Sequence, residues 1–401
     1  MSLASKISVL PLLVLALLLA SGCGKTGDNQ PHQASDTAAP TMGELMGGDI
    51  SGFDSVSPGK ALSFPADHGP HNNFRQEWWY LTANLTTASG EPLGLQWTQF
   101  RVALKPQAAA ESTADGDWQS PQLWFAHAAV TREQSHIATE RWSRGHQELA
   151  SAGGNPFAVK LADWHWQSET DTLFPATLTV TGSNGDKPLG YRLRLSSTSP
   201  LQLQGENGYS AKSADAGLAS YYYSAPFIEI EGEVLLDGSW QKVSGQGWLD
   251  REWSSAFLGL AQQGWDWFAL RLDDGSALML FQLREQNADN TSHAFTHANR
   301  MWPDGRSEQL EVIAMTPTDY HQGYPVTWQL NLKGKSADST ETSNELNLKV
   351  EALNPDARMA LSMQYWEGPV RISRGDSKSD TDSDSKSDSH LGEGYMELTG
   401  Y

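Results

Sequence analysis

Short runs of alternating apolar and polar residues recur along this chain from about residue 60 onward. The clearest runs are 93–104, 122–130, 176–182, 191–197, 227–234 and 267–284. Alternation at period two predicts half-buried β-strands, and long amphipathic helical patterns are scarce. Asp274–Gly275 interrupts the last run and is typical of a hairpin turn. With sixteen tryptophans and thirty-six glycines, the pattern predicts an all-β chain of barrels or sandwiches.

One hairpin design occurs twice. Residues 77–85 (EWWYLTANL) turn and return through 93–101 (LGLQWTQFR), and residues 266–272 (DWFALRL) turn and return through 277–284 (ALMLFQLR). Each copy opens with an acid beside aromatic residues and returns on a strand carrying Gln, an apolar residue and Arg. The repeat predicts two β-domains of one architecture, at 58–240 and 241–401. Chance similarity between amphipathic hairpins is the alternative.

The N-terminal segment is typical of an exported protein. Residues 1–23 form an apolar signal that ends in LASGC, which resembles the bacterial lipobox. We expect Cys23 to be lipidated and 24–57 to be a flexible tether; ordinary secretion with an incidental cysteine is the alternative. Gly24 is not the aspartate that often retains lipoproteins at the inner membrane, so a Gram-negative cell would place the protein at the outer membrane, facing the periplasm.

Charge and cysteine content exclude several functions. The formal net charge is −20, which argues against nucleic acid or anionic lipid as a partner. Cys23 is the single cysteine, so thiol catalysis and zinc-thiolate sites are excluded after lipidation. Residues 372–390 are a Ser/Asp/Lys insertion that predicts a solvated disordered loop, followed by a terminal strand at 394–401.

A set of motifs, in the same order along the chain, gives it a family resemblance. The motifs are FPADHGPHNNFRQEWWYLTANL (64–85), YYYS (221–224), GQGWLDREWSS (245–255), GWDWFALRLDDG (264–275), YWEGPV (365–370) and GYMELTGY (394–401). They resemble the carotenoid 1,2-hydratase (hydroxyneurosporene synthase) family, also called AttH-like and lipocalin-like, over about 60–401. The resemblance implies two lipocalin-like β-barrel domains packed together. It also implies water addition to the terminal double bond of acyclic carotenoids, and association with ABC transporters in the cell envelope.

Several acids stand beside tryptophans, as the implied reaction requires. Protonation of an isolated alkene gives a tertiary carbocation, so a carboxylic acid must be kept protonated by burial, and aromatic faces can stabilise the cation. The catalytic candidates are Asp266, Asp250, Glu252, Glu77 and, as a proton relay, His68. The ligand-binding candidates are Trp79, Trp248, Trp265, Trp267 and Tyr222.

Strand parity and arginine pairing rank these acids. On a strand over 248–253, Asp250 and Glu252 share one face, and adjacent acids force one pKa upward. The alternative is that arginines neutralise the acids in buried pairs. Arg75 is the expected partner of Glu77, whereas Asp266 has no arginine two residues upstream. We therefore place Asp266 first and Asp250 second as the acid that stays protonated.

A loop histidine pair offers a different chemistry. His68 and His71 have the His-x-x-His spacing that can bind a metal. No distant third ligand is evident, so we expect no metal and no other cofactor. A hydrogen bond from a loop histidine to a neighbouring acid is the favoured interpretation.

These features leave three functions open. The first is a lipid-anchored envelope carrier that binds an apolar lipid or isoprenoid. The second is a hydratase-like lyase that adds water to a terminal C=C bond through a protonated carboxylic acid. The third is a structural lipoprotein whose barrels are filled by their own side chains. The carrier predicts that every acid in an aromatic cavity is paired with arginine, whereas the lyase predicts an acid with a raised pKa.

Overall fold

The computed structural model describes residue 47 and residues 49–106, 120–146, 148–214, 217–286, 292–334, 345–375 and 389–401. The predicted signal peptide, Cys23 and most of the tether at 24–57 lie outside these residues, so the lipid anchor and its membrane stay predictions. In this part of the chain, no helix is long and apolar enough to span a membrane.

The prediction of an all-β chain is confirmed. The single described helix is a short 3₁₀ turn, η1 (Ala66–His68). The described strands are β1 (Gln76–Thr87), β2 (Pro92–Ala103), β3 (Gln122–Arg132), β4 (Ser135–Arg144), β5 (Ala150–Gly153), β6 (Ala158–Leu161), β7 (Trp164–Ser168), β8 (Ala176–Asn184), β9 (Lys187–Ser196), β10 (Gln202–Leu203), β11 (Tyr209–Ala211), β12 (Ala219–Leu236), β13 (Ser239–Ser254), β14 (Gln262–Leu272), β15 (Ala277–Gln286), β16 (Ser292–Met301), β17 (Ser307–His321), β18 (Tyr324–Gly334), β19 (Glu345–Ala352), β20 (Arg358–Ala360), β21 (Gln364–Arg374) and β22 (His390–Leu398).

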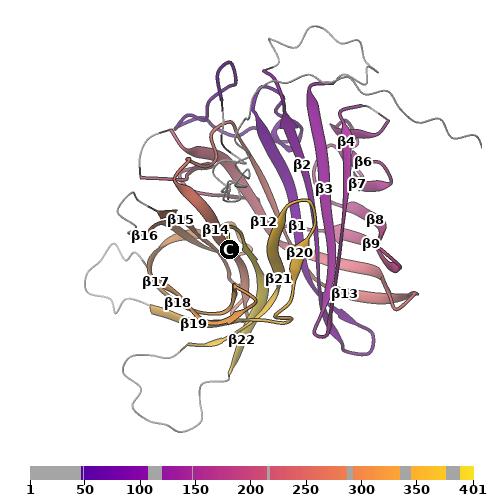
Figure 1. Ribbon diagram of the computed structural model, residues 1–401, viewed down its shortest axis with the longest axis vertical. Coiled ribbons are helices and arrows are strands. Elements are labelled where there is room, and N and C mark those ends of the chain that lie inside the picture. The colour runs from indigo at the N-terminus through magenta and orange to yellow at the C-terminus, as the bar shows by residue number, and fades with distance from the viewer. Residues whose placement is uncertain are drawn as a thin grey trace, which may run out of the picture. The chain divides into compact units, whose positions relative to one another are not determined.

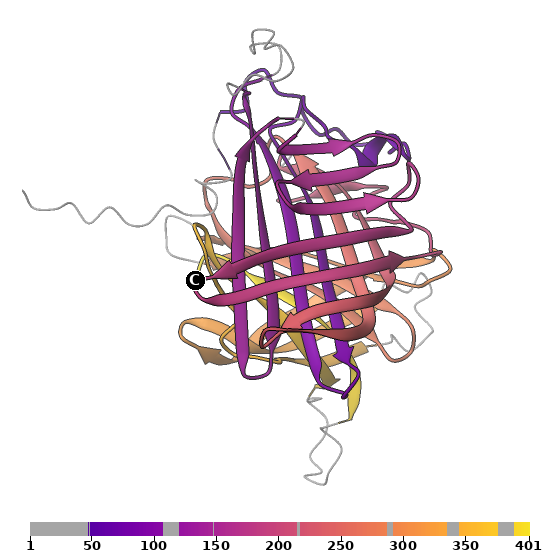
Figure 2. The same cartoon turned by 90° about the vertical axis from the view of Figure 1, so that its right-hand side faces the viewer.

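The first sheet is a nearly closed barrel. Its described strands run in the order β4-β3-β2-β1-β13-β12-β9-β8-β7-β6-β5, with β10 and β11 pairing with β12. In Figure 2, β5–β9 cross in front of the long strands β1–β4. A bridge between His146 and Ala150 joins the end of β4 to the start of β5. The sheet therefore curls back on itself around one apolar core.

The second sheet is a closed barrel. Its described strands run in the order β19-β18-β17-β16-β15-β14-β22-β21-β20, and an additional pairing of β19 with β21 closes the ring seen in Figure 1. The predicted hairpin turn lies between β14 and β15. Gly275 has a φ of +83° there, a conformation that glycine adopts without steric cost. The two barrels in tandem match the fold that the resemblance implied.

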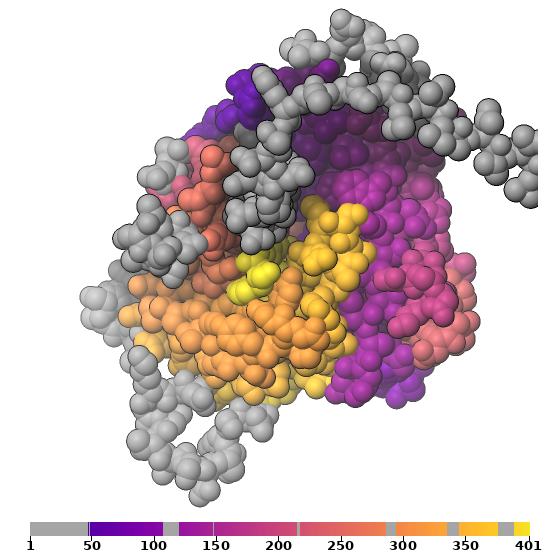
Figure 3. All heavy atoms as spheres, in the orientation of Figure 1, coloured from indigo at the N-terminus to yellow at the C-terminus, as the bar shows by residue number. Residues whose placement is uncertain are grey.

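The two sheets meet through their outer faces. Alternate residues of β1 divide between two environments: Leu81 packs inside the first barrel and Tyr80 packs outside it. On β14, Phe268 packs inside the second barrel and Trp267 packs outside. Period-two alternation thus gives each strand one face for its own barrel and one for its neighbour. The space-filling view shows the orange and yellow second-barrel strands against the magenta strands of the first sheet (Figure 3).

The two sheets approach each other closely at this junction. Asn84 Nδ2 donates a hydrogen bond to the Gly394 carbonyl at 2.9 Å. A Cβ atom at Gly94 would lie only 2.5 Å from the Pro369 ring, so glycine is needed where β2 approaches β21. The junction is therefore a packed interface rather than a loose contact.

Two predicted boundaries differ from the structure. The first sheet ends with β13 at Ser254, and the second begins with β14 at Gln262, so the boundary between the sheets does not lie at residue 240. The reason is that β13 pairs with both β12 and β1. The predicted loop at 372–390 begins too early, because Ile372 is buried on β21 inside the second barrel. Most of that loop (376–388) lies outside the described residues.

Candidate active site

An aromatic cavity of about 90 Å³ lies where the outer faces of the two sheets meet. Both sheets contribute to its wall. The first sheet and the segments beside it provide Trp78, Tyr80, Thr98, Phe100, Lys212, Tyr222, Asp250, Glu252 and Phe257, and the second barrel provides Trp265, Trp267, Phe281, Leu283, Met363, Gln364, Tyr365, Glu397 and Thr399. The sequence predicted five of these lining residues as catalytic or ligand-binding: Tyr222, Asp250, Glu252, Trp265 and Trp267.

Asp250 is a buried acid with no cationic partner among the residues that the structure describes. Its Oδ1 accepts hydrogen bonds from Ser224 Oγ at 2.5 Å and Trp248 Nε1 at 2.8 Å, and its Oδ2 accepts one from the Tyr222 hydroxyl at 2.7 Å. Burial raises the pKa of Asp250 to about 7, although these hydrogen bonds lower it. The negative charge of Glu252 adds to the rise. Trp248 therefore orients Asp250 from behind rather than lining the cavity.

Glu397 brings a second acid from the other barrel. Its Oε1 accepts a hydrogen bond from Trp265 Nε1 at 2.9 Å. Its direct neighbour across the β21–β22 ladder is Glu367, which is 1% exposed and accepts a hydrogen bond from the Tyr80 hydroxyl at 2.5 Å. Burial raises the pKa of Glu397 to about 7. Burial and the charge of Glu397 raise the pKa of Glu367 well above its ordinary value.

Glu252 shares this wall but is neutralised by a lysine. Lys212 Nζ lies 2.7 Å from Glu252 Oε1, and Ser220 Oγ donates to the same oxygen. Lys212 is 2% exposed and its ammonium lies over the rings of Phe257 and Phe281, 4.9 and 4.6 Å from their centroids. Glu252 raises the pKa of Asp250, as predicted for adjacent acids on one face, but Glu252 itself has a lysine partner. Glu397 is a further acid close enough to Asp250 for the Asp250 charge to raise its pKa.

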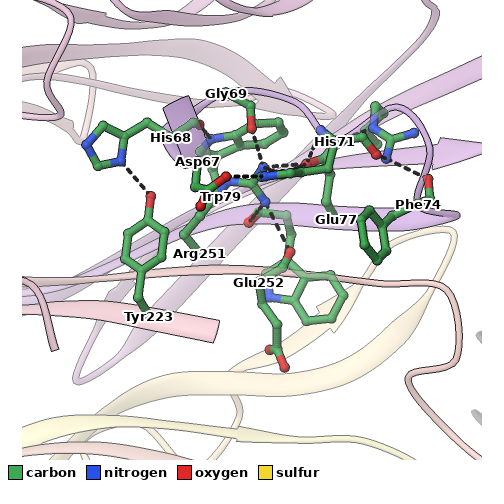
Figure 4. A network of polar contacts seen from close by, with 12 residues as sticks. Asp67, His68, Gly69, His71, Phe74, Glu77, Trp79, Tyr223, Arg251 and Glu252 are labelled. Carbon is green, nitrogen blue, oxygen red and sulfur yellow. Dashed lines mark hydrogen bonds and ion pairs between the residues drawn. The ribbon is translucent and has the colours of Figure 1, made fainter. Parts of the chain in front are cut away.

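Glu77 lies on the opposite, inner face of the first sheet. Its carboxylate contacts Arg101 Nε and Arg251 Nη2 and accepts hydrogen bonds from the His71 backbone N–H at 3.0 Å (Figure 4). Burial alone would raise its pKa, but the two guanidinium groups hold the pKa of Glu77 well below the usual carboxyl range. Glu77 is a structural carboxylate, and its partners here are Arg101 and Arg251, whereas the sequence pointed to Arg75.

His68 and Trp79 belong to the same inner network. His68 Nδ1 hydrogen-bonds with the Tyr223 hydroxyl at 2.8 Å, and Trp79 Nε1 donates to the His68 carbonyl at 2.9 Å. Burial, with the Arg251 charge nearby, lowers the pKa of His68 to about 4. Neither residue lines the cavity, so the structure separates both from the outer-face acids.

The other loop histidine is also held by protein groups. His71 Nε2 lies 3.2 Å from Asp67 Oδ1, and His71 Nδ1 lies 3.2 Å from Glu77 Oε2. The His71 ring stacks on Trp253 with ring centroids 3.9 Å apart. Within the described ranges, no group of three or more His, Cys, Asp or Glu side chains is arranged to hold a metal ion.

Asp266 faces the interior of the second barrel, away from the cavity. Its Oδ2 accepts a hydrogen bond from Gln282 Nε2 at 2.7 Å and lies 3.2 Å from Arg284 Nε, and its Oδ1 accepts one from the Tyr401 hydroxyl at 2.7 Å. Burial raises the pKa of Asp266, and the Arg284 charge opposes the rise. No arginine stands two residues upstream of Asp266, but Arg284 pairs with it from the next strand, so the reason for ranking Asp266 first does not hold.

Both hairpins of the repeat supply an arginine from the returning strand. Arg101 on β2 is the cross-strand neighbour of Glu77, and Arg284 on β15 reaches Asp266 from the ladder position opposite Gly264. The Gln-apolar-Arg segment of each repeat therefore provides the partner, and pairing across the hairpin, rather than distance along the chain, decides which acids are neutralised.

The sequence analysis missed Glu397, Glu367, Tyr80 and Lys212 as parts of the site. Glu397 and Glu367 stand in GYMELTGY and YWEGPV, two of the motifs that carry the resemblance. Both acids occupy outward positions on strands flanked by apolar residues. That alternation was the available signal, but only the packing of the two barrels shows which outward positions are buried.

The raised pKa values predict a stability that falls as pH rises. The folded pKa of Asp250 and Glu397 is about 7, above the ordinary values of 3.8 and 4.5. Between these limits the folded state binds more protons than the unfolded state, so the free energy of unfolding decreases with pH and levels off above about 7. Urea unfolding across this range measures the slope. Asp250→Asn and Glu397→Gln should each flatten it, and an unchanged slope in both variants would contradict the raised pKa values.

Comparisons with known proteins agree with this architecture. A family model described as AttH-like matches residues 55–401. The chain belongs to the AttH-like family. A crystal structure of an AttH protein from Nitrosomonas europaea is 32% identical, with a TM-score of 0.67, and the match covers 87% of this chain and 99% of that one. None of the curated proteins compared with this AttH-like chain matches its sequence.

A hydratase shares the AttH-like fold. Kievitone hydratase from Nectria haematococca is 13% identical, with a TM-score of 0.57, and the match covers 87% of this chain and 96% of that one. At this identity the likeness shows the fold alone. The activity of this AttH-like protein has to be inferred from its own cavity.

Proposed function

We propose that this AttH-like protein is a hydro-lyase that adds water to a C=C bond of an apolar substrate, or removes it, in the cavity between its barrels. The observation that carries the proposal is the pair of acids Asp250 and Glu397. They come from different barrels, line one aromatic cavity, and have no ion-pair partner among the described residues. A carrier would need the aromatic wall but not acids kept in an apolar environment at a pKa near neutrality.

The size of the cavity suits the end of a substrate rather than a whole lipid. About 90 Å³ has room for one small apolar group or several waters. Phe100 on the cavity wall stacks on Phe125, and Phe125 stacks on Trp142, each pair with centroids 4.5 Å apart. Trp142 is 45% exposed. This aromatic row extends from the cavity toward solvent and fits the remainder of a long apolar chain.

Glu397 is the proton donor in this proposal. Glu367 and Glu397 are neighbours, and neither forms an ion pair with a cation in the described part of the chain. Burial and mutual repulsion therefore keep at least one proton on the pair at neutral pH. Glu367 lies behind the wall, whereas Glu397 forms part of it. Glu397 transfers its proton to one alkene carbon, which forms a C–H bond and leaves a tertiary carbocation at the other carbon.

Aromatic faces and Asp250 complete the addition. Trp78, Trp265 and Trp267 line the cavity, and their electron-rich faces stabilise the cation. A water molecule attacks the cation to form the C–O bond and gives a proton to the Asp250 carboxylate. Hydrogen bonds from Tyr222, Ser224 and Trp248 hold that carboxylate in one orientation. One proton leaves Glu397 and one arrives at Asp250, so the sum is the addition of one water. Asp250 gives its proton to water when the product leaves, and the cycle closes when Glu397 regains one.

Product analysis with isotope-labelled water tests this function. The purified protein is incubated with neurosporene or lycopene in heavy-oxygen water, and the extract is examined by mass spectrometry. We expect a hydroxylated product that carries the heavy oxygen on its terminal unit. Absence of labelled product, together with an apolar molecule that co-purifies at one per chain, would contradict the lyase and support the carrier.

A further inference from the structure

A line of polar side chains connects the Glu367–Glu397 pair with the protein surface. It begins at His127, on the outer face of β3, whose Nδ1 hydrogen-bonds with the Tyr365 hydroxyl of β21 at 2.9 Å. The Tyr365 hydroxyl lies close enough to the Glu367 carboxyl to lower its pKa, and Glu367 Oε2 is buried with no hydrogen-bond partner among the described residues. The line crosses the junction of the barrels, because His127 belongs to the first sheet and Tyr365 to the second.

The surface end of the line is Glu140. Glu140 is the cross-strand neighbour of His127, its side chain is 24% exposed, and its Oε2 lies 3.8 Å from His127 Nε2. That ring nitrogen is buried and has no hydrogen-bond partner among the described residues. Ser362 donates from Oγ to Glu140 Oε1 at 2.6 Å, so the carboxylate is held over the histidine. A buried ring nitrogen left unpaired beside a carboxylate in contact with solvent calls for a functional explanation.

The cavity end of the line is Tyr80. Its hydroxyl donates to Glu367 at 2.5 Å and also interacts with Glu397. Each member from His127 to Glu397 can both accept and release a proton. The other titratable groups around the pair are Tyr191, Tyr395, Asp250 and Glu252. Among the described residues, the side chains in contact with the Glu140 carboxylate are His127, Trp142 and Ser362.

We propose that His127 and Tyr365 form a proton path from Glu140 at the surface to the Glu367–Glu397 pair. The inference rests on the proposed function, because that function requires Glu397 to regain a proton after each turnover. While an apolar product fills the cavity, water cannot return the proton from Asp250. The path refills the acid pair from outside, behind the substrate.

The transfer balances as a relay without oxidation or reduction. A proton from solvent at Glu140 bonds to His127 Nε2, while the proton on Nδ1 moves to the Tyr365 oxygen. The original Tyr365 hydroxyl proton moves to the Glu367 carboxylate. Tyr365 remains a neutral phenol, and His127 has exchanged one neutral tautomer for the other. Before the next proton can follow, the imidazole ring and the Tyr365 hydroxyl reorient so that an unprotonated ring nitrogen again faces Glu140. Burial lowers the pKa of His127 to about 4, so the ring is neutral near pH 7 and acts by tautomer exchange.

The first test measures proton exchange without turnover. The full chain is saturated with 2-methylbutane, a saturated analogue of a terminal isoprene unit that cannot be hydrated, and is mixed into heavy water. The carbonyl stretch of the buried carboxylic acid is followed by infrared spectroscopy, and its absence in Glu367→Gln assigns the band. We expect Tyr365→Phe and Glu140→Gln to slow the isotope shift of this band by tenfold or more. Exchange at the wild-type rate in both variants would overturn the path.

The second test uses turnover. His127→Ala should lower kcat by about tenfold with KM unchanged, and added imidazole, which can refill the vacated space, should restore it. Glu140→Gln is the variant that leaves the core intact if His127→Ala fails to fold. If the isotope shift in the variants proceeds at the wild-type rate and imidazole restores no activity, while labelled product is still formed, the proton path is wrong but the hydro-lyase function stands. A missing carboxylic-acid band in the wild type would contradict the proton donor and the path together.

Discussion

Asp250→Asn is expected to lower kcat by about 10²- to 10⁴-fold, the usual contribution of one general acid or base. Asparagine keeps the shape of the side chain but cannot take a proton from the attacking water. Tyr222, Ser224 and Trp248 still hold the side chain in place, so KM should change little. Steady-state kinetics with the substrate that gives labelled product makes the measurement.

Glu397→Gln is expected to lower kcat by a factor of the same order, because the amide cannot protonate the alkene. Two matched variants serve as controls. Glu393→Gln changes an acid at an outward position of the same strand, β22, whose side chain is 49% exposed. Asp266→Asn changes a buried acid beside two tryptophans that faces the other way. We expect kcat within about twofold of wild type for both. Full activity in Asp250→Asn, or complete loss in folded Asp266→Asn, would show that the assignment of faces is wrong.

Glu77→Gln is expected to lower the free energy of unfolding by about 3–5 kcal/mol, the cost of leaving a buried charge without its partner. Arg101 and Arg251 are both 0% exposed and would keep two positive charges inside the first barrel. Such a loss is a large fraction of the stability of a typical domain. Urea unfolding monitored by tryptophan fluorescence gives the value.

Glu91→Gln is the control for this experiment. Glu91 also pairs with an arginine, Arg132, at 2.6 Å, but its side chain is 38% exposed. Solvent screens such a pair, so the loss should stay below about 1 kcal/mol. Equal effects of the two substitutions would contradict a structural role for Glu77. Glu77→Gln protein that remains folded should retain normal kcat, since the carboxylate faces away from the cavity.

The alternation along the chain was sufficient to predict the strands and the shared face of Asp250 and Glu252. That shared face is a local property, fixed by the period of a strand. The repeat also indicated two domains, although the boundary at residue 240 missed the return of β13 to β1. Strand pairing between segments far apart in the sequence determined that boundary.

The ranking of the acids required contacts that a single sequence does not give. Asp266 ranked first because no arginine stands two residues upstream, yet Arg284 reaches it from the next strand. Glu252 does raise the pKa of Asp250, yet Lys212 also pairs with Glu252 from the segment after β11. Alternation placed Glu397 at an outward position, but the burial of an outward-facing acid depends on which barrel packs over it.

The close fit of β2 against β21 at Gly94 and Pro369 helps to keep water away from the two acids of the cavity. Asp250 belongs to one barrel and Glu397 to the other, so the access of water to both acids depends on how closely the two barrels pack at their junction. A wedge of a few ångströms would admit solvent, lower both pKa values toward those of ordinary carboxylic acids, and remove the proton that the reaction needs. A larger residue at position 94 would therefore abolish activity from a distance, by separating the barrels without unfolding either of them.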